Sequence, residues 1–324
     1  MGKTLDYFLI KRLTILINRT SLEAKGMGLN LIKSSAFRRG SVVSTVLLIS
    51  ASLIIPLSSP ASAAESCTDT LTKAQAASYV RMSSYQQPPH GWFDINSGKY
   101  QGIDVEVIEE VLKGLNIKDW DYVTADWGAM IPGLTACRWD IMSIGMTYTK
   151  LRSEKVQFSI PVYQYGVAML VAKGNPKKIK GKADWKGKKV GGIIGSTDDQ
   201  VIGGVKGATY VPFTKYSDLY RALSTGRIDA GMVDELQGAY DFKLQPQPKI
   251  TVVKNWTGKA VGISSIVMRL GDTAWITAVN EQLKIMRANG KLKAILLKYG
   301  MPETAYITCD APTSFTTDGI AQCP

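Results

Sequence analysis

The sequence predicts an α/β fold. Short apolar runs typical of buried strands recur at residues 140–146, 167–172, 189–194 and 228–233. Longer stretches between them carry apolar residues at helical spacing. Strands that alternate with helices indicate a mostly parallel sheet. The 324 residues are enough for one large domain or for two lobes, each with its own core.

Turn and helix signals place further elements along the chain. Residues 79–82 are predicted as a short strand, and residues 96–99 as a turn between extended segments. Asp104 begins a helix, with its apolar face formed by Val105, Ile108, Val111, Leu112 and Leu115. A second helix is expected over residues 127–137. A long helix is expected to end in the Asn-Gly pair within residues 283–290.

The positive charge of the chain is unevenly distributed. The net charge is +12, from 39 Lys and Arg against 27 Asp and Glu. Half of that excess lies in residues 1–63. A composition of 45% hydrophobic and 20% charged residues excludes a disordered tail and a polytopic membrane protein. The lysine-rich run at residues 177–189 contains a single aromatic residue, Trp185, and no repeated interleaving of aromatic residues, so it predicts a solvated face and no nucleic-acid partner.

Residues 1–63 are predicted to be a signal peptide. Two arginines precede an apolar stretch over residues 41–57, and small residues then fit cleavage before Ala64. Residues 1–26 are unusual ahead of such a signal, and Met27 would begin one of normal length, which suggests a misassigned start codon. An uncleaved anchor helix is the alternative, although the apolar stretch is short for a span.

Four cysteines follow the predicted cleavage site: Cys67, Cys137, Cys309 and Cys323. An even number in an exported chain favours two disulfides, for which three pairings are possible. We favour Cys309–Cys323, because it would close a Pro/Thr-rich tail, with Cys67–Cys137 as the remaining pair. Free thiols are one alternative, and lipid attachment at Cys67 is another.

Catalytic and metal-binding patterns are scarce in the sequence. His90 is the only histidine, so no Ser-His-Asp or Cys-His set extends beyond it and no cluster has metal-ligand spacing. The glycine-rich residues 191–197 lack the lysine of a phosphate-binding loop and the spacing of a dinucleotide fingerprint. We therefore expect no cofactor and no metal.

Small, hydroxylated or acidic residues follow several predicted strands. They are Gly145-Met146-Thr147, Gly195-Ser196-Thr197 and Asp234. Ligands of open α/β sheets bind at the carboxyl ends of strands, where these residues fall. The pattern therefore predicts a site for a small polar ligand.

Six segments, taken in order, resemble the bacterial extracellular solute-binding proteins of family 3, which serve amino-acid ABC importers. The resemblance covers residues 79–299. The segments are Pro88-Pro89-His90, the block from Gly98 to Glu106, the helix from Trp127 to Leu134, Gly145-Met146-Thr147-Tyr148-Thr149-Lys150-Leu151-Arg152, Phe158-Ser159-Ile160-Pro161-Val162-Tyr163, and Gly226-Arg227-Ile228-Asp229-Ala230 with Asp234-Glu235. Each motif is weak alone, and their common order makes the resemblance specific.

The resemblance implies an α/β, type II periplasmic-binding-protein fold of two lobes, each a mixed sheet flanked by helices, joined by a two-strand hinge. Lobe 1 would comprise residues 64–165 and 262–324, and lobe 2 residues 168–258, with linkers near 165–167 and 259–261. The implied protein is a periplasmic monomer and not an enzyme. It would close on an amino acid and deliver it to the membrane permease of an ABC importer.

The resemblance also implies a ligand site, formed by Arg152, Asp234, Thr147, Gly145, Thr197, Trp127, Ser196, Tyr85 and Gln87. Arg152 would hold the α-carboxylate in a bidentate pair, with help from the Thr147 and Thr197 hydroxyls. Asp234 and the Gly145 carbonyl would bind the α-ammonium, and Trp127 would stack on the ligand.

Each of these roles has a structural alternative. Arg152 could form a surface ion pair with Glu154. Asp234 and Thr197 could act only as helix N-caps. Trp127 could be an ordinary core residue.

Several residues depart from the family pattern. His90 stands where phenylalanine is common, and Ser84 stands where relatives that hold a cationic side chain often have an acid. Asp126 could replace that acid. Tyr85, Gln87 and Trp92 instead suggest a ligand with a neutral polar or larger side chain.

Two other functions remain as alternatives. One is a periplasmic enzyme on the same scaffold, similar to cyclohexadienyl dehydratase, with His90 or Asp126 as the acid or base. The other is a soluble sensor domain that acts through a partner.

Overall fold

The structure is a computed structural model that describes residues 67–142, 144–253, 256 and 261–323. Its first main sheet, here called the β1 sheet, has the strand order β4-β1-β5-β13-β6. These strands are β1 (Tyr79–Ser84), β4 (Asp119–Thr124), β5 (Ile141–Met142), β6 (Val156–Phe158) and β13 (Val267–Arg269). The pairs β1–β4 and β1–β5 are parallel, whereas β13 is antiparallel to β5 and β6.

The second main sheet, here called the β10 sheet, has the strand order β11-β7-β10-β8-β9, with β12 also paired to β7. Its strands are β7 (Tyr163–Ala172), β8 (Lys189–Ile193), β9 (Thr209–Phe213), β10 (Ala230–Asp234), β11 (Ile250–Val253) and β12 (Val261–Ser264). The β10–β8 and β8–β9 pairs are parallel, and the pairs that involve β7 are antiparallel. Both sheets are thus mixed, as the family resemblance implied, and they are not mostly parallel as the alternation of strands and helices had indicated.

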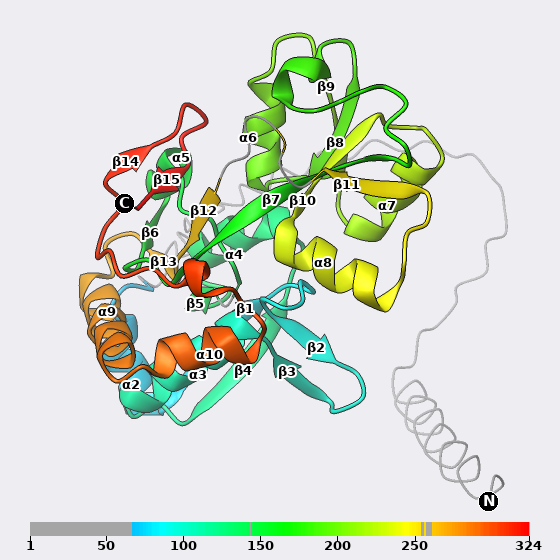
Figure 1. Ribbon diagram of the computed structural model, residues 1–324. Coiled ribbons are helices and arrows are strands. Elements are labelled where there is room, and N and C mark those ends of the chain that lie inside the picture. The colour runs from blue at the N-terminus through cyan, green and yellow to red at the C-terminus, as the bar shows by residue number, and fades with distance from the viewer. Residues whose placement is uncertain (1–66, 143, 254–255, 257–260, 324) are drawn as a thin grey trace, which may run out of the picture. The chain divides into compact units, whose positions relative to one another are not determined.

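Strand β7 connects the two sheets (Figure 1). Its first residues pair with β12, from Tyr163 opposite Ser264 to Gly166 opposite Val261. Its later residues pair with β10 and β11. The predicted linker at residues 165–167 therefore lies within a continuous strand. The lobe boundaries themselves stay a prediction, and residues 259–260 of the second predicted linker lie outside the described residues.

Helices pack against the β1 sheet and form a large apolar core with it. They are α2 (Thr70–Ala77), α3 (Ile103–Gly114), α9 (Thr273–Ala288) and α10 (Lys291–Lys298). The predicted apolar face of α3 is confirmed, since all of its predicted members are buried. Other short elements are the helix α5 (Lys150–Ser153), the 3-10 helix η3 (Glu303–Ala305), and the hairpin of β2 (Trp92–Asp94) and β3 (Lys99–Gln101). The hairpin confirms the turn predicted at residues 96–99.

The β10 sheet has apolar cores on both of its faces. Its helices are α6 (Thr197–Gly203), α7 (Tyr216–Ser224), α8 (Glu235–Leu244) and the 3-10 helix η2 (Lys182–Trp185). Met232 of β10 packs with α6 residues, and the next residue, Val233, packs with α7 residues on the opposite face. Because alternate side chains point to opposite faces, a strand covered on both sides must be apolar throughout. This explains the continuous apolar runs in the sequence.

Two predicted elements are shorter in the structure. The strand expected over residues 140–146 is restricted to β5, since the Met146 N–H turns back to donate to Ile144 O at 2.6 Å. The helix expected over residues 127–137 consists of the 3-10 helix η1 (Trp127–Ala129) and α4 (Met130–Thr135). Long helix α9 ends before Asn289 and Gly290 as predicted, with Gly290 at φ +77°.

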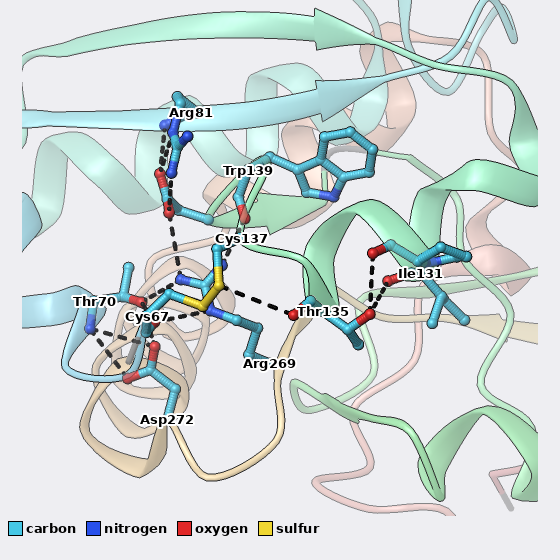
Figure 2. The surroundings of a disulfide bond; sticks show 11 residues. Cys67, Thr70, Arg81, Ile131, Thr135, Cys137, Trp139, Arg269 and Asp272 are labelled. Atoms are coloured by element: carbon cyan, nitrogen blue, oxygen red, sulfur yellow. Dashed lines mark hydrogen bonds and ion pairs between the residues drawn. A yellow bond between two sulfur atoms is a disulfide. The ribbon is translucent and has the colours of Figure 1, made fainter. Parts of the chain in front are cut away.

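Both favoured disulfides are present. Cys309 pairs with Cys323, near the small hairpin β14 (Ser314–Phe315) and β15 (Ala321–Gln322), and Cys67 pairs with Cys137. Figure 2 shows the second bridge beside Arg269, which donates to Cys67 O at 2.9 Å and to Trp139 O at 2.6 Å. Disulfide and arginine together fix the start of the described chain to the β1 sheet.

The predicted signal peptide lies outside the described residues. In the part of the chain that is described, no helix has the length and apolar character needed to cross a membrane.

Candidate functional site

A small cavity lies where β8, β10 and the segment after β5 come together. Its volume is about 30 Å³. It is lined by Tyr85, Gln87, Trp127, Thr147, Arg152, Tyr165, Val167, Ile193, Ser196, Thr197, Asp198, Tyr216 and Asp234. This position matches the predicted one, because residues at the carboxyl ends of parallel strands meet at one edge of a sheet.

Arg152 supplies the positive charge of the cavity. It lies in the short helix α5 and is only 8% exposed. Its Nη1 donates to Thr147 O at 2.9 Å, and its Nη2 donates to Gly195 O at 3.1 Å. Burial lowers the pKa of Arg152 to about 10, so the side chain remains charged at neutral pH. These two bonds leave further guanidinium N–H groups for a carboxylate, since the group has five.

Asp234 supplies a buried negative charge on the opposite side of the cavity. It ends β10, caps α8 and is 7% exposed. Its Oδ1 accepts the N–H groups of Leu236 and Gln237, both at 2.9 Å. Asp234 is thus the N-cap of α8, and it lines the cavity at the same time.

The only histidine lies behind Asp234, in a network that spans several elements. His90 Nε2 lies 3.1 Å from Asp234 Oδ2, and His90 Nδ1 lies 2.5 Å from the Tyr163 hydroxyl. Tyr163 in turn donates to Asp104 Oδ2 at 2.9 Å. Burial lowers the pKa of His90, but the charges and hydrogen bonds of Asp234 and Asp104 outweigh it and raise this pKa to about 10.

Local backbone contacts explain why His90 reaches this position. The N–H of Asp104, in the first turn of α3, donates to His90 O at 2.9 Å. Gly102 makes this approach possible, because a Cβ at that residue would lie 2.4 Å from His90 O and its φ is +135°. Gly102, which stands two residues before Asp104 in the sequence motif, thus has a steric role.

Tyr165 organises the predicted ligand contacts at Gly145 and Thr147. Its hydroxyl donates to Gly145 O at 2.7 Å and lies 2.6 Å from Thr147 Oγ1. Since the single Tyr165 proton goes to Gly145, the Thr147 hydroxyl donates to Tyr165. Gly145 is absent from the cavity lining, whereas every other predicted ligand residue lines it.

Besides the contact between His90 and Asp234, polar contacts of Trp127, Arg152 and Tyr85 join the β1-sheet side of the cavity to the β10-sheet side. The indole Nε1 of Trp127 donates to Gly195 O at 3.1 Å, and Arg152 donates to the same oxygen. The Tyr85 hydroxyl donates to Thr214 O at 2.9 Å. Trp127 is buried and packs edge-on against Tyr85, with the Arg152 guanidinium 5.8 Å from its ring centroid.

The residues at the start of α6 complete the β10-sheet side. Ser196 is the N-cap, and its hydroxyl accepts the Asp198 N–H at 3.1 Å. Thr197 is the first residue of the helix and leaves the capping role to Ser196. Asp198 Oδ2 accepts the Ile193 N–H at 2.9 Å, and burial raises the pKa of Asp198 to about 6.

Some residues that line the cavity were not predicted from the sequence to be site residues. Tyr165 was noted only as part of a linker, Val167 and Ile193 only as parts of a linker or predicted strands, and Tyr216 was not singled out at all. The alternation of β7 was the available signal, since it places Tyr163, Tyr165 and Val167 on one side of the strand.

A larger cavity of about 610 Å³ adjoins the small one at Tyr85 and Tyr216. Asp126 lines this larger cavity and is exposed. Trp92 lines neither of the two, and packs on Tyr240 with ring centroids 5.7 Å apart.

The fold and this cavity define a class of protein: a two-sheet α/β protein with a small, polar-lined cavity at the ends of its strands. The family is shown by comparison. Residues 80–302 match the family model of bacterial extracellular solute-binding proteins, family 3, and the chain belongs to this family.

Individual relatives support the same assignment. The chain is 33% identical over 219 residues to an L-cystine-binding protein of Escherichia coli (strain K12), which covers 65% of this chain and 78% of that protein. Among solved structures, an ancestral arginine-binding protein bound to arginine is 30% identical with a TM-score of 0.62, covering 68% of this chain and 98% of its own. An ancestral amino-acid-binding protein, described as a precursor of cyclohexadienyl dehydratase, is 29% identical with a TM-score of 0.63. The match covers 71% of this chain and 99% of that chain.

Proposed function

We propose that this chain is the substrate-binding protein of an ABC importer, and that it captures an amino acid in the small cavity. The observation that carries this proposal is the presence of Arg152 and Asp234 in one cavity, both more than nine-tenths buried. A buried cation and a buried anion within one small site match the two charges of a zwitterion. Family membership and relatives that are named for cystine and arginine binding support the same ligand class.

Each part of the ligand has a proposed partner. The α-carboxylate pairs with the free N–H groups of Arg152, and the Thr197 hydroxyl adds a donor from the other side. The α-ammonium binds Asp234. The side chain packs against Trp127 and extends past Tyr85 toward the larger cavity.

Ligand capture would involve movement of two lobes, one built on each sheet. The strands β7 and β12 are the proposed hinge, because both sheets are connected through their ladder. The contacts from Gly195 O to Trp127 and Arg152 are bonds that closing of the lobes would form. Ligand that bridges both lobes therefore favours the closed arrangement.

We further propose that the protein acts as a periplasmic monomer, delivers its ligand to a membrane permease and catalyses no reaction. Export through the predicted signal peptide and the family's periplasmic relatives support the location. His90 supports the absence of catalysis, because its ring is fully buried and both of its nitrogens face hydrogen-bond partners. Product analysis after incubation with prephenate or arogenate tests this part.

The experiment for the main proposal is a thermal-shift panel, followed by calorimetry. The panel contains the common amino acids, cystine, opines and betaines. Ligand at one hundred times its dissociation constant stabilises a protein by about 2.7 kcal/mol, which is readily seen. Failure of the entire panel to raise the Tm of the mature chain would refute amino-acid binding.

Arg152→Ala identifies the site. We expect it to abolish amino-acid binding, because the carboxylate loses its buried cation. Lys180→Ala is the matched control, since Lys180 is exposed and is not among the lining residues. Circular dichroism melts show that each variant is folded, and wild-type affinity in Arg152→Ala would refute the assignment.

A further inference from the structure

His90 is a cation that the protein places beside its own ligand site. The Tyr163 hydroxyl donates its single proton to Asp104, so its oxygen accepts from His90 Nδ1. The opposite nitrogen, Nε2, faces Asp234 Oδ2, and a carboxylate can only accept. Both ring nitrogens therefore carry hydrogen. This protonation follows from the direction of the hydrogen bonds, and the raised pKa of His90 agrees with it.

Every charged or titratable group that faces His90 is consistent with a stable cation there. Asp104 comes from α3, Asp234 from the end of β10, and Tyr163 and Tyr165 from β7. Two of these groups are carboxylates and two are hydroxyls. The positive charge of His90 is thus held on two sides by negative charge, in a position with no exposure to solvent.

Asp234 has protein partners on both of its oxygens. Oδ2 faces His90, and Oδ1 accepts the two N–H groups at the start of α8. A buried carboxylate without a cation is costly, and in a site with no other cation the ligand's ammonium would have to supply it. Here His90 already does so.

We propose that the site also binds α-carboxylates with a hydroxyl in place of the α-ammonium, and that His90 is the residue that allows this. The inference rests on the proposed function, because Arg152 must still hold the carboxylate. A 2-hydroxyl group can donate to a remaining lone pair of Asp234 without bringing a charge. The ligand class is therefore 2-hydroxy acids together with their amino-acid counterparts.

The test compares amino acids with side-chain-matched hydroxy acids. The pairs are L-alanine with L-lactate, L-phenylalanine with L-3-phenyllactate, and L-glutamate with L-2-hydroxyglutarate, plus the 2-hydroxy analogue of the best amino acid from the panel. Calorimetry at pH 7.5 gives the ratio of the two Kd values for each pair that binds. In the wild-type protein we expect the hydroxy acid to bind within tenfold of the amino acid.

Two variants assign this tolerance to His90. In His90→Phe, Asp234 loses its cation, so we expect the ratio to shift at least tenfold toward the amino acid. The His90 ring is tightly packed against Gly145, since a Cβ at residue 145 would lie 2.5 Å from His90 Nδ1, so there is little room for a phenylalanine ring at residue 90. His90→Gln is therefore included, because it keeps a donor for Asp234 and removes only the charge. Lys180→Gln removes one exposed charge elsewhere and should leave the ratio unchanged.

The outcomes separate this inference from the proposed function. A wild-type ratio above tenfold, or an unchanged ratio in the folded His90 variants, overturns the inference while amino-acid binding stands. If neither the amino acids nor their analogues bind, the proposed function itself fails. The wild-type ratio decides the matter even if both variants fail to fold.

Discussion

His90 Nε2 lies 3.1 Å from Asp234 Oδ2, although the two residues are 144 positions apart. His90 belongs to the loop after β1, and Asp234 ends β10. The bond therefore joins the parts of the protein that carry the two main sheets. It also couples the only histidine to one of the two charges that we assign to ligand binding.

The stability of the protein should depend on His90 at alkaline pH. The pKa of His90 is about 10 in the folded protein, against an ordinary value of 6.5. A group with a raised pKa contributes its full stabilisation below pH 6.5 and loses it as the pH rises through about 10. The difference in unfolding free energy between wild type and His90→Gln should therefore shrink steadily between these values.

Urea melts from pH 6 to pH 10.5 measure this difference. Comparison with His90→Gln cancels the titration of surface lysines and tyrosines, which both proteins share. A difference that stays constant over the entire range would show that His90 does not exchange its proton on unfolding in this way.

Asp234→Asn should weaken amino-acid binding while preserving helix α8. Asparagine is as good an N-cap as aspartate, so the bonds to Leu236 and Gln237 survive. A hydrogen bond to a charged group contributes about 1.5–3 kcal/mol, which predicts a loss of about ten- to hundredfold in affinity. Calorimetry measures the loss. Asp218→Asn, on an exposed part of α7, is the control, and equal affinities in the two variants would contradict the role of Asp234.

Gly195→Ala should interfere with closing of the cavity. Gly195 has φ +76°, and a Cβ there would lie 2.9 Å from the Cα of Gly128, which belongs to η1 on the opposite side. We expect at least a tenfold loss of amino-acid affinity, and no ligand-induced decrease in radius of gyration by small-angle X-ray scattering.

Gly174→Ala is the matched control for this effect. Gly174 has nearly the same φ of +77°, but a Cβ at that residue would have no neighbouring atom within 4 Å. Both variants therefore bear the strain of a left-handed alanine, about 1–2 kcal/mol. Only Gly195→Ala meets a neighbour, so similar affinity in both variants would exclude the steric explanation.

The two disulfides should differ in their contribution to stability. Cys67–Cys137 closes a separation of 70 residues, and Cys309–Cys323 one of 14. Loop-closure entropy then favours the longer bridge by about 1.4 kcal/mol. We expect the double replacement Cys67→Ser/Cys137→Ser to lower the Tm more than Cys309→Ser/Cys323→Ser. Neither should change ligand affinity, because none of these cysteines lines the small cavity, and the reverse order of Tm would contradict the entropic argument.

Much of the fold follows from local patterns in the chain. The apolar face of α3 is visible in the spacing of Val105, Ile108 and Val111, and helix periodicity alone places them in the core. The unbroken apolar run of β10 likewise signals a strand covered on both faces. Such patterns depend on near neighbours in sequence, so they can be read without the structure.

The part of the candidate site that is formed by residues at the ends of strands was predictable from the sequence. Thr147 and Ser196 follow strands and Asp234 is the last residue of one, and all three line the cavity. Tyr165 and Tyr216 had no such signal. They line the cavity because of how β7 and α7 lie in space, and nothing in their immediate sequence distinguishes them from core aromatics.

The sequence by itself determined the family pattern, the two mixed sheets, the cysteine pairing that we favoured and most of the residues around the cavity. The tertiary structure decided what those residues do to one another. His90 is an ordinary loop residue in the sequence, and it is a buried cation only because Asp104, Tyr163 and Asp234 converge on it from three elements. Charge and hydrogen-bond direction depend on distances of a few ångströms, and folding alone sets those distances between remote residues.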